Sequence, residues 1–220
     1  MPGPRSSSLV ILDCDGVLVD SEHLLLDVRK QMLAELGVHL ERAVMVTRFV
    51  GTPHGDFVGQ IEQLTGRPMP VDWDDDYLER CRLSFEKDLV PVPGIEAALD
   101  AIDLPMCVAS SGSHEKMRLT LAITGLLPRF EDVLFSANDV ERGKPFPDLF
   151  LYAAEGMGFR PDACVVVEDS EAGVAAALAA GMGVVAFAGS VTPRSKLMRP
   201  CVQVIDSMID LPAAIAMLTA

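Results

Sequence analysis

Two aspartates stand two residues apart in the stretch Asp13-Cys14-Asp15-Gly16-Val17. If the chain is extended through them, their side chains point to the same side. Carboxylates held side by side repel each other, so one pKa rises. Such a pair can divide into an ionised nucleophile and a protonated acid, or bind a cation together. A strand-terminal turn, which Asp-Gly sequences often form, explains the same residues without any chemistry.

A second acidic pair, Glu168 and Asp169, is followed by Ser170, which we expect to cap the next helix. A capping turn accounts for the serine but poorly for two consecutive acids. If these acids meet Asp13 and Asp15, their combined negative charge requires a cation. Oxygen ligands with room for water suit Mg²⁺ bound together with a phosphate.

Positive charge and hydrogen-bond donors are expected from two loops. Lys144 lies between a glycine and a proline, and these rigid neighbours favour a placed ammonium group over an ordinary surface lysine. Ser110 and Ser111 precede a glycine, so they offer a hydroxyl and successive backbone N–H groups to an oxyanion. A serine-rich turn without a ligand is the alternative interpretation.

The elements that must position these residues are short strands alternating with helices. Each of four apolar runs predicts a strand buried on both faces: Leu9–Leu12, Met106–Ala109, Cys164–Val167 and Val184–Phe187. Val133–Phe135 is a shorter fifth candidate. Helical spacing lies between them, at Ile95–Ile102, Glu115–Ile123, Leu149–Met157 and Glu171–Ala180. The alternation predicts an α/β fold with a Rossmann-like parallel sheet, whose ligands gather at the carboxyl ends of the strands.

The alternation is interrupted after the first strand. Leu24–Leu36 and Tyr77–Phe85 look helical, with no buried strand between them. We therefore predict a core domain formed by residues 1–20 and 89–220, with an α-helical insertion at 21–88. A short helix is expected at Leu211–Thr219, near the end of the chain.

The composition narrows the class of ligand. The chain of 220 residues is 50% hydrophobic and carries 32 acidic against 18 basic residues, a net charge of −14. This field disfavours nucleic acid and anionic membranes, so we expect neither as a partner, and a phosphorylated ligand needs local positive charge. No apolar run is long enough to span a membrane. The five cysteines form no CxxC pair, which favours reduced thiols and a cytoplasmic location. The oligomeric state is not indicated.

Taken together, the motifs resemble the haloacid dehalogenase superfamily of phosphatases and phosphomutases. The motifs are DCDGVLVDSE at 13–22, Ser110 after the second strand, GKPFPD at 143–148 and EDSEAG at 168–173. The helical insertion resembles the small cap domain of members like beta-phosphoglucomutase and phosphoglycolate phosphatase. The resemblance covers nearly the whole chain.

The resemblance implies that Asp13 attacks phosphorus to form an aspartyl-phosphate, while Asp15 protonates the leaving group and then activates water. It further implies that Mg²⁺ is held by Asp13, the backbone carbonyl of Asp15 and Asp169, with Glu168 nearby or ligating. Ser110, the Ser111 amide and Lys144 would neutralise the transferring phosphoryl oxygens.

Two departures from the mutase pattern favour hydrolysis. Leu25 stands where beta-phosphoglucomutases have a histidine, and His54 stands where they have an arginine. The expected substrate is a small phosphorylated metabolite of sugar or sugar-acid type. Glu22, Arg48, Thr52 and His54 are the expected selectivity residues of the insertion, although each is also compatible with an ordinary helix surface. The alternatives are a phosphomutase and a catalytically idle binding protein of the same fold.

Overall fold

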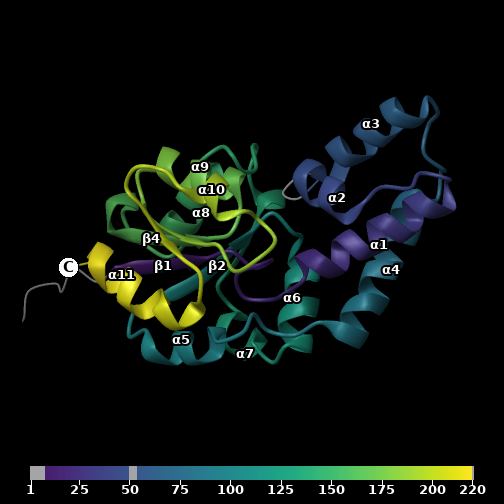
Figure 1. Cartoon of the computed structure of the whole chain (residues 1–220). Coiled ribbons are helices and arrows are strands. Elements are labelled where there is room, and N and C mark those ends of the chain that lie inside the picture. The colour runs from purple at the N-terminus through teal and green to yellow at the C-terminus, as the bar shows by residue number, and fades with distance from the viewer. Residues whose placement is uncertain (1–7, 50–53, 220) are drawn as a thin grey trace, which may run out of the picture. The chain divides into compact units, whose positions relative to one another are not determined.

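The computed structural model describes residues 8–49 and 54–219, and the chain divides into two compact units (Figure 1). One unit combines the residues up to Asp20 with those from Val90 onward, and the other spans Ser21–Leu89. The structure places Leu89 in the helical unit, one residue later than the predicted boundary. Leu89 is buried there, and its backbone N–H donates to Phe85 O at 3.1 Å.

The first unit is built on a six-stranded sheet in which every neighbouring pair is parallel. Its strands run in the order β3-β2-β1-β4-β5-β6. Their bounds are β1 Leu9–Leu12, β2 Met106–Ser110, β3 Leu134–Ser136, β4 Cys164–Glu168, β5 Gly183–Phe187 and β6 Val202–Ile205. The predicted α/β fold and its five strands are confirmed. The prediction missed β6, an edge strand in which Ile205 is buried and the other three residues are half-buried.

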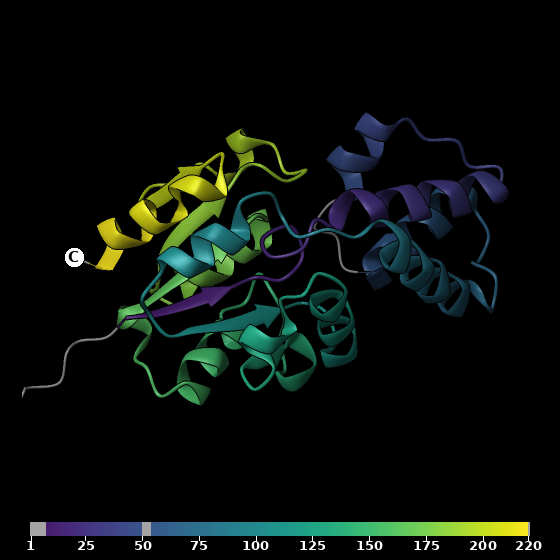
Figure 2. The same cartoon turned by 90° about the horizontal axis from the view of Figure 1, so that it is seen from below.

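Helices lie on both faces of this sheet (Figure 1). On one face α8 (Asp148–Gly156), α9 (Glu171–Ala179) and α10 (Arg194–Leu197) contribute to the main apolar core. On the other face α11 (Leu211–Thr219) packs on β5 and on α5 (Ile95–Ala101) (Figure 2). Burial on both sides explains why the strand sequences are continuous apolar runs rather than alternating ones.

Further helices and turns complete the unit. They are α6 His114–Ile123, α7 Leu127–Phe130, and the 3₁₀ turns η1 Ala137–Asp139, η2 Pro161–Ala163 and η3 Met208–Asp210. Ser113 caps α6, because its side chain accepts from Lys116 N at 3.2 Å. Ser170 caps α9 as predicted, accepting from Gly173 N at 3.0 Å. These caps fix where both helices begin, close to the carboxyl ends of β2 and β4.

In its described residues the helical unit contains four helices: α1 Glu22–Glu35, α2 Arg42–Phe49, α3 His54–Thr65 and α4 Trp73–Asp88. The prediction included α1 and α4, which pack on each other, and missed α2 and α3. Phe49 and Phe57 pack edge to face at a centroid distance of 5.0 Å, and the Arg29 guanidinium lies 4.5 Å from the Phe57 ring. No helix in the described part of the chain is both long enough and apolar enough to cross a membrane.

Candidate active site

The site lies where β1, β2 and β4 end. Asp13 N donates to Val167 O at 3.0 Å, so β1 stays aligned with β4 up to the first aspartate. The chain then turns sharply at Gly16, where φ is +79° and the N–H donates to Val19 O at 2.8 Å. A Cβ on Gly16 would lie 2.1 Å from Asp169 Oδ2. The missing side chain therefore lets the Asp169 carboxylate approach the turn that follows Asp13.

Lys144 joins the ends of the three strands. Its Nζ donates to Asp13 Oδ1 at 2.5 Å, to Glu168 Oε1 at 2.6 Å and to Ala109 O at 3.2 Å. The Lys144 side chain is 5% exposed. An ammonium group has three donors, and all three meet oxygen acceptors here. The structure thus brings Lys144 together with predicted residues of both acidic motifs.

Glu168 uses both of its carboxylate oxygens within the protein. Oε1 accepts from Lys144, and Oε2 accepts from the backbone N and the hydroxyl of Ser170, both at 2.8 Å. A Cβ on Gly173 would lie 1.8 Å from Oε1, so α9 approaches the carboxylate closely. These contacts orient Lys144, and the expectation that Glu168 lies near the metal or ligates it stays a prediction.

Burial sets the electrostatics of the cluster. It raises the pKa of Asp13 from 3.8 to about 7, against the lowering effect of Lys144 and with the help of Glu168 and Asp15. For Lys144, burial favours the neutral amine, but the charges of Asp13 and Glu168 outweigh it and raise the pKa above its ordinary value. Lys144 is therefore the fixed cation of the site, while Asp13 needs further positive charge to stay ionised at neutral pH.

Asp15 is held by a lysine that the sequence analysis did not single out. Lys116 Nζ donates to Asp15 Oδ2 at 2.8 Å from the first turn of α6. Cys14 lies between the two aspartates, and its Sγ is 3.8 Å from Thr120 Oγ1. Burial raises the pKa of the Cys14 thiol well above its ordinary value, so this cysteine is no thiolate nucleophile.

Hydrogen bonds of two serine side chains hold the turn that follows β2. Ser110 is buried, and its Oγ accepts from Gly112 N at 3.1 Å. The hydroxyl of Ser136, at the end of β3, donates to Gly112 O at 2.7 Å. Ser111 is exposed. The predicted phosphate-binding serines are therefore held in a fixed turn at the same sheet edge as Asp13.

The oxygen donors at this edge fit a magnesium ion. Asp13 and Asp169 are 6% and 4% exposed, and both belong to loops that meet at Gly16. Among residues 8–49 and 54–219, no three histidine, cysteine or acidic side chains form a ready metal cage. Mg²⁺ commonly uses one or two carboxylates and completes its shell with water and phosphate oxygens. Two buried carboxylates match that requirement.

The predicted selectivity residues belong to the helical unit. Glu22 is the first residue of α1, and Arg48 lies in α2, where its Nε donates to Gln60 Oε1 at 3.2 Å. Thr52 is outside the described residues. His54 begins α3, but its side chain is likewise outside the description.

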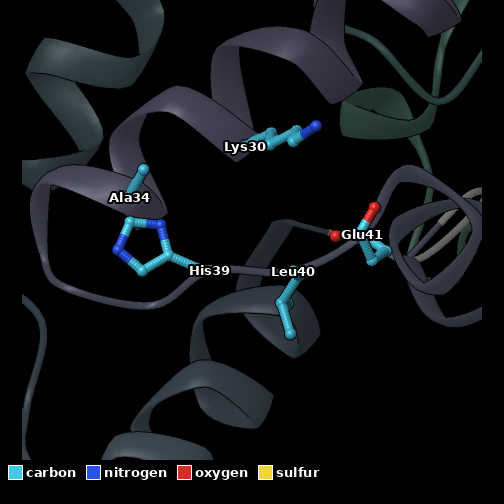
Figure 3. Close-up of a pocket in the computed structure, with 5 residues that line it drawn as sticks. All are labelled: Lys30, Ala34, His39, Leu40 and Glu41. Carbon is cyan, nitrogen blue, oxygen red and sulfur yellow. The ribbon is translucent and has the colours of Figure 1, made fainter.

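A pocket in the helical unit is lined by other residues than the predicted selectivity residues. Figure 3 shows its residues, Lys30, Ala34, His39, Leu40 and Glu41. None of the predicted selectivity residues is among them, so this pocket adds nothing to the candidate site.

Comparisons with known proteins agree with this geometry. The model of the haloacid dehalogenase-like hydrolase family matches residues 8–181. The chain is 32% identical over 206 residues to the 6-phosphogluconate phosphatase of Escherichia coli, with 92% of each chain covered.

Two solved structures extend the likeness to the whole fold. A haloacid dehalogenase-like protein of unknown function from Agrobacterium tumefaciens superposes with a TM-score of 0.87 at 36% identity, covering 97% of this chain and 100% of that one. A hydrolase of the same family from Deinococcus radiodurans, with bound phosphate and sodium, gives a TM-score of 0.75 at 29% identity, covering 97% and 96%.

Proposed function

Because the chain belongs to the haloacid dehalogenase-like hydrolases and is a phosphoric monoester hydrolase of that family, we propose that it dephosphorylates a small metabolite with Mg²⁺ through an aspartyl-phosphate. The observation that carries this proposal is the Lys144 ammonium, which lies 2.5 Å from Asp13 Oδ1 and 2.6 Å from Glu168 Oε1 at the end of β1. It fixes a cation beside the first of two closely spaced aspartates, which is the arrangement that phosphoryl transfer to a carboxylate requires.

In the first half-reaction a carboxylate oxygen of Asp13 attacks phosphorus while the bond from phosphorus to the ester oxygen breaks. Asp15, in its protonated form, gives its proton to that oxygen, so the product leaves as a neutral alcohol. In the second half-reaction Asp15 takes a proton from water as the water oxygen attacks phosphorus, and the bond from phosphorus to the Asp13 carboxylate oxygen breaks. Inorganic phosphate is released, and Asp13 and protonated Asp15 are restored.

Positive charge lowers the barrier to both steps. The Lys144 ammonium, Ser110 and the Ser111 amide offset the charge of the transferring oxygens. Asp13, Asp169 and the backbone carbonyl of Asp15 would hold Mg²⁺, and that ion supplies additional electrostatic stabilisation when bound. Glu168 contributes indirectly, because its contacts orient Lys144.

The proposed substrate class is a sugar phosphate or sugar-acid phosphate. The likeness to a 6-phosphogluconate phosphatase over most of both chains supports it. We assign substrate selection to the helical unit, with Glu22, Arg48, Thr52 and His54 as the candidate residues. In this proposal His54→Ala changes the relative rates across substrates, and identical relative rates would remove His54 from the set.

The test is release of inorganic phosphate from a panel of sugar and sugar-acid phosphates with and without Mg²⁺. We expect Mg²⁺-dependent turnover, and a loss of about 10²–10⁴-fold in Asp15→Asn. Unchanged turnover in that variant would contradict the assigned mechanism. An isomeric sugar phosphate in place of inorganic phosphate would identify a mutase.

A catalytically idle protein is distinguished by a different measurement. Beryllium fluoride mimics a phosphoryl group on an aspartate, so the proposal expects it to bind at Asp13 in the presence of Mg²⁺. Neither turnover nor binding of this mimic would indicate that the fold serves only as a binding protein.

A further inference from the structure

A second lysine reaches the site from α6. Lys116 Nζ donates to Asp15 Oδ2 at 2.8 Å, whereas Lys144 contacts Asp13. Each aspartate of the first motif therefore has its own ammonium partner. The side chains of Lys116 and Asp15 are 30% and 15% exposed, so the pair is open enough for a proton to leave Asp15 toward a substrate oxygen.

The backbone around Lys116 is fixed by three contacts. Ser113 caps α6 by accepting from Lys116 N at 3.2 Å, so the lysine sits in the first helical turn. Ser110 Oγ accepts from Gly112 N at 3.1 Å, and the Ser136 hydroxyl donates to Gly112 O at 2.7 Å. The position of the lysine is thereby tied to the carboxyl ends of β2 and β3.

The lack of a side chain at Gly112 leaves room for the aliphatic chain of Lys116. A Cβ at this residue would lie 3.2 Å from Lys116 Cδ, 3.4 Å from Ser110 Oγ and 3.8 Å from Asp15 Oδ2. Any larger residue here would press on this aliphatic chain where it passes toward the aspartate. The turn at Gly112 and the first turn of α6 thus place the Lys116 ammonium group beside one carboxylate oxygen of Asp15.

We propose that Lys116 is a positioning residue for Asp15: it holds Oδ2, so that the other carboxyl oxygen, Oδ1, carries the proton toward the leaving group. This inference rests on the proposed function, because it assigns Asp15 the role of acid in ester cleavage. Orienting one oxygen matters because proton transfer depends steeply on the position of the donor. A surface ion pair without this role would contribute little to stability and nothing to the reaction.

The test compares phosphate esters that differ mainly in how strongly departure of the leaving group depends on its protonation. Phenyl, para-chlorophenyl and para-nitrophenyl phosphate release phenolates of similar shape, and para-nitrophenolate, the least basic of them, departs with the least protonation. The quantity measured is kcat/KM, which reports the steps up to formation of the aspartyl-phosphate. The variants are Lys116→Met and Lys116→Gln, so that a slope is available even if one of them does not fold.

We expect kcat/KM to fall about tenfold more for phenyl than for para-nitrophenyl phosphate in these variants, giving a steeper dependence on leaving-group acidity than in the wild type. Lys116→Arg keeps a cationic donor and should recover part of the wild-type slope. The matched control is Arg118→Met, which removes a positive charge from the same helix at a side chain whose contacts are with Glu131. It should retain the wild-type slope.

An equal loss for all three esters would overturn the positioning role, since a purely structural defect does not depend on the leaving group. So would an unchanged kcat/KM for every ester. Failure of the proposed function would look different, because the wild-type protein itself would then show no Mg²⁺-dependent hydrolysis of any ester.

Discussion

Lys144 Nζ lies 2.6 Å from Glu168 Oε1, and the two side chains are 5% and 1% exposed. The same nitrogen bonds Asp13, so one buried ammonium balances two buried carboxylates. Removing one partner of a buried pair leaves uncompensated charge in a region of low dielectric constant, which costs far more than losing a surface ion pair. This contact therefore links the stability of the sheet edge to its chemistry.

Lys144→Met should lower the free energy of unfolding by about 3–5 kcal/mol and abolish turnover. Two carboxylates would remain buried without their cation, so the deficit should shrink as the pH falls and they become protonated. Urea denaturation at several pH values measures it. Lys196→Met is the control, because Lys196 is exposed and lies 3.7 Å from Glu171; it should cost no more than about 0.5 kcal/mol. Equal losses in the two variants would refute the buried-pair interpretation.

The raised pKa of Asp13 predicts how pH and magnesium act together. Between its ordinary pKa of 3.8 and about 7, the native metal-free protein keeps a proton that the unfolded chain has released. The contribution of Asp13 to the free energy of unfolding therefore falls as the pH rises through this window. Mg²⁺ binds the ionised carboxylate, so protons compete with it. The rise in Tm caused by Mg²⁺ should be larger at about pH 8 than at about pH 6.

Asp13→Asn serves as the matched variant for this experiment. It removes the titrating group, so most of the magnesium effect on Tm and its pH dependence should disappear. Asp132→Asn alters an exposed aspartate and should keep both. A magnesium effect that is independent of pH in the wild type would show that Asp13 is not a ligand.

The contacts of Asp139 predict that its ionised carboxylate stabilises the fold and that this stabilisation is lost in acid. Its Oδ2 accepts from Ser136 N at 3.1 Å and lies 2.8 Å from His114 Nε2. Burial opposes ionisation, but these contacts outweigh it and hold the pKa of Asp139 below its ordinary 3.8. The stabilisation is present above pH 3.8 and is lost as the pH falls through the lower folded value.

Asp139→Ala should therefore cost about 1 kcal/mol near neutral pH, because it removes the acceptor of the hydrogen bond from Ser136 N. Its unfolding free energy, measured in urea, should converge with that of the wild type as the solution is acidified. Asp132→Ala, at a nearby exposed position, is expected to show no such convergence. A gap between Asp139→Ala and the wild type that stays constant down to acid pH would contradict the assignment.

The sequence predicted the strands and the sheet edge that carries the site, because both follow from local patterns. Apolar runs such as Cys164–Val167 that alternate with helical segments indicate a parallel sheet, and the polar residues that follow the strands are then expected at one edge. Lys116 was missed because a charged residue in the first turn of an amphipathic helix looks like solvated surface. The signal was the cap residue Ser113, which fixes the helix start and so places Lys116. The role of Glu168 depends on contacts that no local pattern shows.

Gly16→Ala tests whether the turn after Asp13 requires a residue without a side chain. Gly16 has φ +79°, and an added Cβ would meet Asp169 Oδ2 at 2.1 Å, so the carboxylate would be displaced. We expect a loss of roughly 1–3 kcal/mol in unfolding free energy and a fall of about 10²-fold in turnover, since small misplacements at a reacting centre have large effects. Gly125→Ala isolates the backbone strain, because Gly125 has φ +74° and nothing within 4 Å of the added atom. It should lose about 1 kcal/mol and keep full activity. If both alanine variants retain activity equally, the approach of Asp169 to the turn has no part in catalysis, whereas loss confined to Gly16→Ala assigns the effect to that carboxylate.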